Sequence, residues 1–202
     1  MKHKVVIASS NPGKCHEIED SLSEFNFEFL LQNHLGITSV EETGATFVEN
    51  AILKARHACL HSGYMALADD SGLVVDALDG APGLYSARYA GPDCDFKDNI
   101  NLLLDNMRDV PQAKRSATFY CSLVWMRDAN DTMPLICHGA WRGEITLACS
   151  GQHGFGYDPV FYCPEKQCTA AELDFNMKQS FSHRGRAMRL LTSMLPSFLN
   201  GG

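Results

Sequence analysis

The stretch Met65-Ala66-Leu67-Ala68-Asp69-Asp70-Ser71-Gly72-Leu73-Val74-Val75 places two adjacent carboxylates inside an otherwise apolar run. The apolar residues before the acids predict a buried strand that ends at Asp69-Asp70, and a second, short strand is expected over 73–77. Burying an unpaired charge in an apolar core costs a free energy on the order of several kcal/mol. The pair therefore indicates a bound cation, a proton to be moved, or both. Because Ser71 adds a hydroxyl and Gly72 lets a ligand approach the backbone, the stretch predicts a metal and phosphate centre.

Composition and charge limit the classes of protein to which the chain can belong. A chain of 202 residues with 45% hydrophobic content predicts one compact domain over 1–202. We see no apolar run of about 18 residues, and the apolar part of the N-terminus is too short for a signal peptide, so no membrane association and a cytoplasmic location are expected. The formal net charge of −7 argues against a nucleic-acid partner, which needs a concentrated basic face.

Most of the eight cysteines lie in apolar or amphipathic runs, which predicts buried free thiols rather than a disulfide framework. The spacing of Cys163 and Cys168, with no second pair, argues against a zinc site.

Hydrophobic periodicity predicts strands that alternate with helices. Strands are expected at 5–8, 27–31, 117–126, 135–141 and 160–162. Helices are expected after 14, at 46–61, at 95–107 and from about 182. Thr46 and Glu49 have the form of a capping box. The last helix is expected to carry its apolar side on Ala187, Leu190, Leu191, Met194 and Leu195. Because βα units surround a central hairpin, we expect an α/β fold with a mixed sheet flanked by helices.

Gly13-Lys14 lies at a strand-to-helix turn, where backbone N–H groups and the positive end of a helix meet an anion. The spacing is not that of a P-loop, and a plain connection explains it equally well. Lys54 can be read as a phosphate contact or as a solvated helical lysine. Asp69 and Asp70 can also cap a turn or pair with Arg88.

Magnesium requires hard oxygen ligands, commonly one or two carboxylates with phosphate oxygens and waters. Asp70 together with Glu41 or Glu42 would meet that need. The loop Phe155-Gly156-Tyr157-Asp158 combines a stacking ring with a carboxylate. The pair His183-Arg184 often only begins a helix, but together with such a loop it favours recognition of a flat polar ring.

Seven segments, in this order, closely resemble the inosine triphosphate pyrophosphatase family, whose bacterial members are called dITP/XTP pyrophosphatases. The segments are spread over nearly the whole chain and are Ser10 to Lys14, Glu42 to Ala51, Ala68 to Leu73, Gly80 to Gly83, Ser86 to Tyr89, Gly154 to Pro159 and Ser182 to Gly185.

The resemblance implies an elongated mixed β-sheet with two lobes and a central active-site cleft, assembled as a homodimer. It implies Mg²⁺-dependent hydrolysis of the purine nucleoside triphosphates ITP, dITP and XTP to the monophosphate and pyrophosphate. Asp70 would accept the proton and bind Mg²⁺ with Glu41 as the second acid, or with Glu42 in its place. The implied substrate-binding residues are Ser9, Ser10, Asn11, Pro12, Gly13, Lys14 and Lys54 at the phosphates, Ser71 elsewhere on the substrate, and Phe155, Gly156, Tyr157, Asp158, Lys178, His183 and Arg184 around the base.

Three alternatives stay open at this stage. A related house-cleaning phosphohydrolase would act on modified or canonical pyrimidine triphosphates. A nucleotide-binding module would bind without catalysis, and a thiol or zinc protein would depend on its cysteines.

Overall fold

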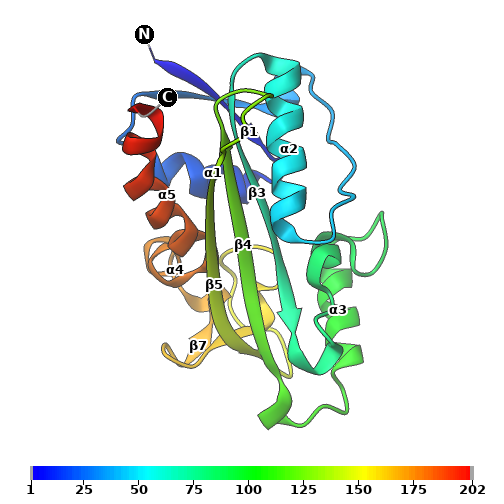
Figure 1. The fold of residues 1–202 in the computed structure, drawn as a ribbon. Helices are drawn as coiled ribbons and strands as arrows, with labels where there is room; N and C mark the ends of the chain where they lie inside the picture. Colours follow the sequence, from blue (N-terminus) through cyan, green and yellow to red (C-terminus); the bar gives the residue numbers. More distant parts are fainter. Residues whose placement is uncertain (1, 201–202) are drawn as a thin grey trace. The chain divides into compact units, whose positions relative to one another are not determined.

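The computed structural model describes residues 2–200 (Figure 1). Its strands are β1 (His3–Ala8), β2 (Phe27–Leu31), β3 (Met65–Val75), β4 (Ser116–Met126), β5 (Leu135–Ile145), β6 (Phe161–Cys163) and β7 (Cys168–Thr169). Its α-helices are α1 (Pro12–Ser21), α2 (Phe47–Ser62), α3 (Phe96–Asn106), α4 (Phe175–Phe181) and α5 (His183–Asn200).

The strands form one mixed sheet in the order β2-β1-β3-β4-β5-β6-β7. β1 runs parallel to β2 and to β3, whereas β6 runs antiparallel to both of its neighbours. The connection between β4 and β5 is too short for a parallel crossover, so the two form the expected hairpin. The predicted mixed sheet flanked by helices is confirmed.

Two predictions about individual elements were wrong, and one element was missed. The expected two strands around Asp69-Asp70 are a single strand, β3, with the acids in its middle. Ser71 and Gly72 continue the strand because neither residue forces a turn. On α5, Leu190 and Met194 are about half exposed rather than on the apolar side. Two apolar residues in one turn, Leu190 and Leu191, cannot both face the sheet, and Leu191 is the buried one. The short helix α4 was not predicted.

The contacts of the chain divide it into two compact units. The first unit contains the chain up to Asp70, Cys121–Gly139 and the chain from Arg184 onward. The second contains Ser71–Tyr120 and Ala140–His183.

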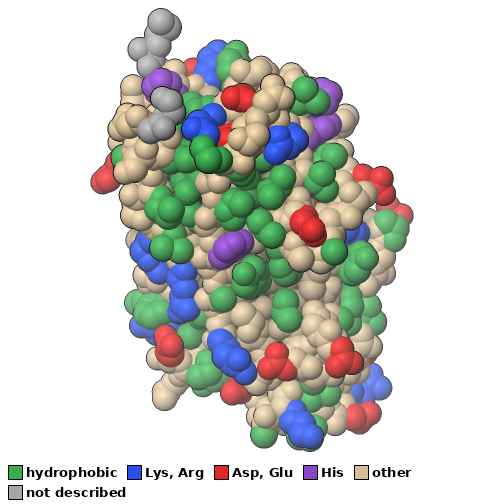
Figure 2. Space-filling model, viewed as in Figure 1, with side chains coloured by type: hydrophobic (Ala, Val, Ile, Leu, Met, Phe, Trp, Pro, Cys, Tyr) green, Lys and Arg blue, Asp and Glu red, His purple; other side chains and the backbone are tan. Residues whose placement is uncertain are grey.

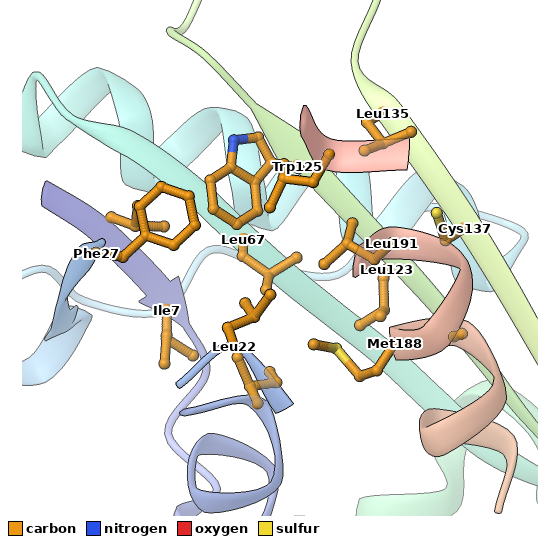
Figure 3. Packing of buried hydrophobic residues seen from close by; sticks show 14 of the residues in the cluster. Ile7, Leu22, Phe27, Leu67, Leu123, Trp125, Leu135, Cys137, Met188 and Leu191 are labelled. Carbon is orange, nitrogen blue, oxygen red and sulfur yellow. The ribbon is translucent and has the colours of Figure 1, made fainter. Parts of the chain in front are cut away.

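The first unit has a core on each face of its strands. On one face, apolar side chains of β1, β3, β4 and β5 pack against α1 and α5, and Figure 3 shows Leu67 and Leu123 among Leu22, Met188 and Leu191. On the other face, small residues of α2 such as Ala51 and Ala55 pack against Ala66 and Ala68 of β3. Alternation along β3 thus supplies both cores from one strand.

The second unit has its own core, in which Leu103 of α3 and its C-cap Met107 pack against Phe119, Trp141 and Phe161. Within residues 2–200, no helix combines the length and the apolar character needed to cross a membrane. Basic and acidic side chains are interspersed on the face drawn in Figure 2.

Candidate active site

The candidate site of the first unit begins where β1 ends against the middle of its parallel neighbour β3. Ala8 of β1 pairs with Ala68 of β3, so the loop after β1 leaves the sheet next to Asp69 and Asp70. Adjacent strand residues point to opposite faces. Asp69 consequently faces α1 and α5, whereas Asp70 faces α2, and the two carboxylates have different partners.

Asp69 is the centre of a buried ionic cluster. Its carboxylate accepts from Lys14 Nζ at 2.5 Å and from Arg184 Nε at 2.7 Å, and the Cys121 thiol donates to Oδ2 at 3.2 Å. Arg184 also contacts Glu17 Oε2 through Nη1 at 2.5 Å. Burial alone would raise the pKa of Asp69, but the charges of Arg184 and Lys14 outweigh it and hold that pKa well below its usual range. Asp69 therefore stays ionised and anchors two cations.

Asp70 forms an ion pair with Lys54 of α2. Lys54 Nζ lies 2.6 Å from Asp70 Oδ1 and 3.1 Å from Glu42 Oε1. Burial raises the pKa of Asp70, and Lys54 offsets this only in part. The carboxylate of Asp70 is thereby a better proton acceptor than an ordinary aspartate.

The loop that carries Glu42 is fixed against the start of α2. Gly44 N donates to Asn50 Oδ1 at 2.8 Å, and a Cβ at Gly44 would come within 2.6 Å of Glu49 Cβ. Thr46 begins α2 as its N-cap, as predicted, with its hydroxyl accepting from Glu49 N at 3.3 Å. The reciprocal bond of the expected capping box is displaced by one residue, because the Glu49 carboxylate accepts from Ala45 N at 2.8 Å. This arrangement brings Glu42 to Lys54, while Glu41 is exposed.

The predicted phosphate-binding segment lies between β1 and α1. Ser9 and Ser10 follow the strand, Asn11 is the N-cap, and Pro12, Gly13 and Lys14 begin the helix. The Asn11 side chain accepts from Gly13 N at 2.9 Å and from Lys14 N at 3.2 Å. An anion at this helix end would share these N–H groups with Asn11.

The remaining predicted residues lie in the second unit. Ser71 is half-buried on β3. In the glycine-rich loop, Asp158 accepts from Phe155 N at 2.8 Å and from Lys178 Nζ at 2.5 Å, and Lys178 lies 4.5 Å from the centre of the Phe155 ring. Asp158 and Lys178 are both buried.

Two glycines and two rings complete this group. Gly154 and Gly156 have φ of +73° and +64°, and a methyl at Gly154 would collide with the Asp158 carboxylate. Tyr157 donates its hydroxyl to Ser86 O at 2.9 Å. His183 stacks on Phe119 with the ring centres 4.7 Å apart.

Three contacts were missed by the sequence reasoning. Glu17 and Cys121 belong to the cluster around Asp69, and Phe119 supports His183. Only Glu17 left a signal, since it lies one helical turn after Lys14 and shares its face of α1. The predicted base contact Arg184 is 1% exposed and contacts Asp69 and Glu17.

A magnesium ion was expected at Asp70. Among the described residues, no set of three or more His, Cys, Asp and Glu side chains is arranged to hold a metal. Asp70 and Glu42 nevertheless converge on one cation, the Lys54 ammonium, and both offer the hard oxygens that Mg²⁺ prefers. The donor set fits an ion that takes its remaining ligands from phosphate and water.

Comparisons with known proteins cover nearly the whole chain. A curated dITP/XTP pyrophosphatase of Pectobacterium atrosepticum is 53% identical over 192 residues, which are 95% of this chain and 98% of that protein. One of Vibrio parahaemolyticus is 51% identical over 95% of this chain and 96% of its own length.

Among solved structures, a HAM1 protein from Coxiella burnetii aligns with a TM-score of 0.90 and 46% identity, covering 96% of this chain and 99% of that one. A nucleoside-triphosphatase, dITP/XTP pyrophosphatase, from Mycobacterium abscessus aligns with a TM-score of 0.76 and 39% identity over 96% and 99%. These findings confirm the resemblance drawn from the motifs. The sequence model of the Ham1 family matches residues 5–194, and the chain belongs to the Ham1 family.

Proposed function

We propose that this chain is a nucleoside-triphosphate pyrophosphatase that hydrolyses dITP, XTP and ITP to the monophosphate and pyrophosphate. The observation that carries the proposal is the Asp70 carboxylate, whose pKa is raised by burial and which meets Lys54 and Glu42 beside the loop after β1. The names of the curated relatives support the substrate class.

In this reaction a water oxygen attacks the α-phosphorus and the bond from that phosphorus to the bridging oxygen of the β-phosphate breaks. Asp70 accepts the proton of the water, and pyrophosphate leaves with the bonding electrons. Lys14 and Lys54 add positive charge at the end of β1 and on α2, where charge grows on the phosphate oxygens. Asp69 holds Lys14 in this role at 2.5 Å.

We further propose that Asp70 and Glu42 hold Mg²⁺, with Glu42 in place of Glu41 because only Glu42 contacts Lys54. When bound with substrate, the ion would neutralise phosphate charge. Lys54 would keep the two carboxylates together before the ion arrives.

Selectivity for 6-oxopurines follows from hydrogen-bond donors. Adenine presents an amino group at the position where hypoxanthine and xanthine present oxygen. A buried donor directed at that oxygen would face a second donor with ATP, at a cost of about 1–3 kcal/mol for each unpaired group. We assign base contacts to the segment Phe155–Asp158 with Lys178 and His183. We also assign Arg184, which is held by its ion pairs with Asp69 and Glu17, as a hydrogen-bond donor to the base.

A nucleotide panel at one Mg²⁺ concentration tests the proposal, with chromatography of the monophosphate and pyrophosphate. We expect dITP, XTP and ITP to be cleaved faster than ATP, dTTP and UTP. Preference for dTTP or UTP would instead identify a pyrimidine house-cleaning enzyme, and binding without pyrophosphate release would identify a non-catalytic module.

We also propose a homodimer, as the family resemblance implies, and a cytoplasmic location. Light scattering during size-exclusion chromatography tests the first. A mass near 22.3 kDa, that of a single chain, would contradict it.

A further inference from the structure

Two thiols of the second unit lie opposite each other in the sheet. Cys163 ends β6, Cys168 begins β7, and the two are direct partners in the antiparallel register. Partner residues in such a ladder have Cα atoms about 4.5–5.5 Å apart and side chains on the same face. That separation falls within the range of about 4.4–6.8 Å that a disulfide requires.

The hairpin holds this geometry without a covalent link. Lys166 N and Gln167 N both donate to Cys163 O, at 3.1 and 2.9 Å. Cys163 is buried in the core of the second unit, and Cys168 packs against the same core while remaining partly exposed. Both thiols are free.

The chain that follows Cys168 anchors the glycine-rich loop. Thr169 Oγ1 donates to Ser150 O at 2.8 Å. Gln152 N and His153 N both donate to Ala171 O, at 3.1 and 2.9 Å. A constraint on the start of β7 therefore acts directly on the chain that leads to Phe155.

We propose that Cys163 and Cys168 are a redox-responsive pair that forms a reversible disulfide across the β6–β7 hairpin and steadies the loop over 150–158. With oxidised glutathione as the oxidant, the partly exposed Cys168 thiolate attacks one glutathione sulfur and releases one glutathione. Cys163 then attacks the Cys168 sulfur and releases the second. Two protein thiols and one oxidised glutathione give one protein disulfide and two reduced glutathiones, which carry the two thiol protons.

The first step requires the Cys168 thiolate. Burial, Glu172 and Cys163 raise the pKa of Cys168, and Lys166 lowers it. Because the thiolate is the attacking species, incubation at about pH 8 favours the reaction.

The sequence offers a direct assay. Lys166 lies between the two cysteines, so trypsin separates them into peptides that only a disulfide can hold together. The exposed Cys149 lies on the same peptide as Cys163, and the experiment is therefore done in a Cys149→Ser background. The protein is incubated with oxidised glutathione, its remaining thiols are alkylated under denaturing conditions, and the digest is analysed by mass spectrometry without reductant.

We expect the peptides ending at Lys166 and beginning at Gln167 to appear as one linked species, which dithiothreitol separates. Cys168→Ser should abolish the linked species, with circular dichroism as the check on folding. Hydrogen exchange at Gln152 and His153 should be slower in the oxidised protein than in the reduced one. Two results would overturn the proposal. One is the recovery of Cys163 and Cys168 as alkylated thiols after the oxidation step, and the other is a hydrogen-exchange rate at Gln152 and His153 that is the same in the oxidised and the reduced protein.

Discussion

Asp69 and Asp70 are neighbours in sequence but serve opposite faces of β3. Asp69 binds Lys14 of α1 and Arg184 of α5, whereas Asp70 binds Lys54 of α2. The pKa of the first is held down by its cations and that of the second is raised by burial. The pair therefore divides into one acid that anchors the fold and one that can accept a proton.

Replacing the anchoring acid should destabilise the protein. Asp69→Asn leaves Arg184 and Lys14 without the charge that they share, and breaking a buried ion pair costs about 3–5 kcal/mol. Urea unfolding followed by circular dichroism measures the loss. Asp105→Asn is the control, because Asp105 pairs with Arg108 on the exposed surface and should cost less than about 1 kcal/mol. Equal losses in the two variants would contradict the anchoring role.

The pH profile of hydrolysis should report on Asp70. The general base must be ionised, so kcat/KM falls as the pH falls through the pKa of Asp70, which lies above the ordinary value of about 3.9. Lys54→Met removes the cation that lowers this pKa and should move the acidic limb to higher pH. Lys4→Met makes the same change of charge beside Tyr64 and should leave the limb in place. If the acidic limb of the kcat/KM profile of Lys54→Met lies at the same pH as that of the wild type, Asp70 is excluded as the titrating group.

Acid sensitivity of folding should depend in part on the Arg127–Asp131 pair. Hydrogen bonding to Arg127 lowers the pKa of Asp131 to about 2, despite an opposing effect of burial. Because the folded pKa lies below the unfolded value of about 3.9, the carboxylate stabilises the fold above about pH 4 and loses this effect as the pH falls towards 2. Asp131→Asn should be less stable than the wild type at about pH 6, with the difference shrinking by about pH 3. Urea unfolding at the two pH values tests this expectation. A difference in unfolding free energy between the two proteins that does not change with pH would contradict the stabilising role of the ionised Asp131.

The glycine at 154 should be required for the Asp158–Lys178 contact. Gly154→Ala places a methyl against the Asp158 carboxylate at a φ of +73°. Gly63→Ala is a matched control, because Gly63 has a φ of +69° and nothing within 4 Å of an added Cβ. Gly63→Ala should cost about 1 kcal/mol from the backbone alone. Gly154→Ala should cost more and should raise the KM for dITP, and identical losses would show that the contact with Asp158 is unimportant.

The fold was predictable where local signals agree with the packing. Thr46 and Glu49 mark the start of α2, and the alternation after Ala117 marks β4. Helix α4 was missed because seven residues are too few for a periodic apolar face. Its signal was the N-cap Asp174, which accepts from Met177 N at 2.7 Å.

The residues of the candidate site could be proposed from the sequence, but their contacts could not. Arg184 lies 115 residues from Asp69 and 167 from Glu17, so no local pattern links them. The choice between Glu41 and Glu42 depends on the loop that the hydrogen bond from Gly44 N to Asn50 Oδ1 fixes. That hydrogen bond corresponds to no periodic pattern in the sequence. The sequence suggested which side chains could carry the chemistry, and the strand alternation of β3 determines the partner of each acid.

The most direct test is the turnover of Asp70→Asn on dITP, measured by pyrophosphate release, with urea unfolding of the same preparation. Asparagine keeps the shape of the side chain but cannot accept the proton of the attacking water. We predict a kcat lower by about 10²–10⁴ with an unfolding free energy near that of the wild type. A kcat close to the wild-type value in the folded variant would contradict the assignment of Asp70 as the proton acceptor.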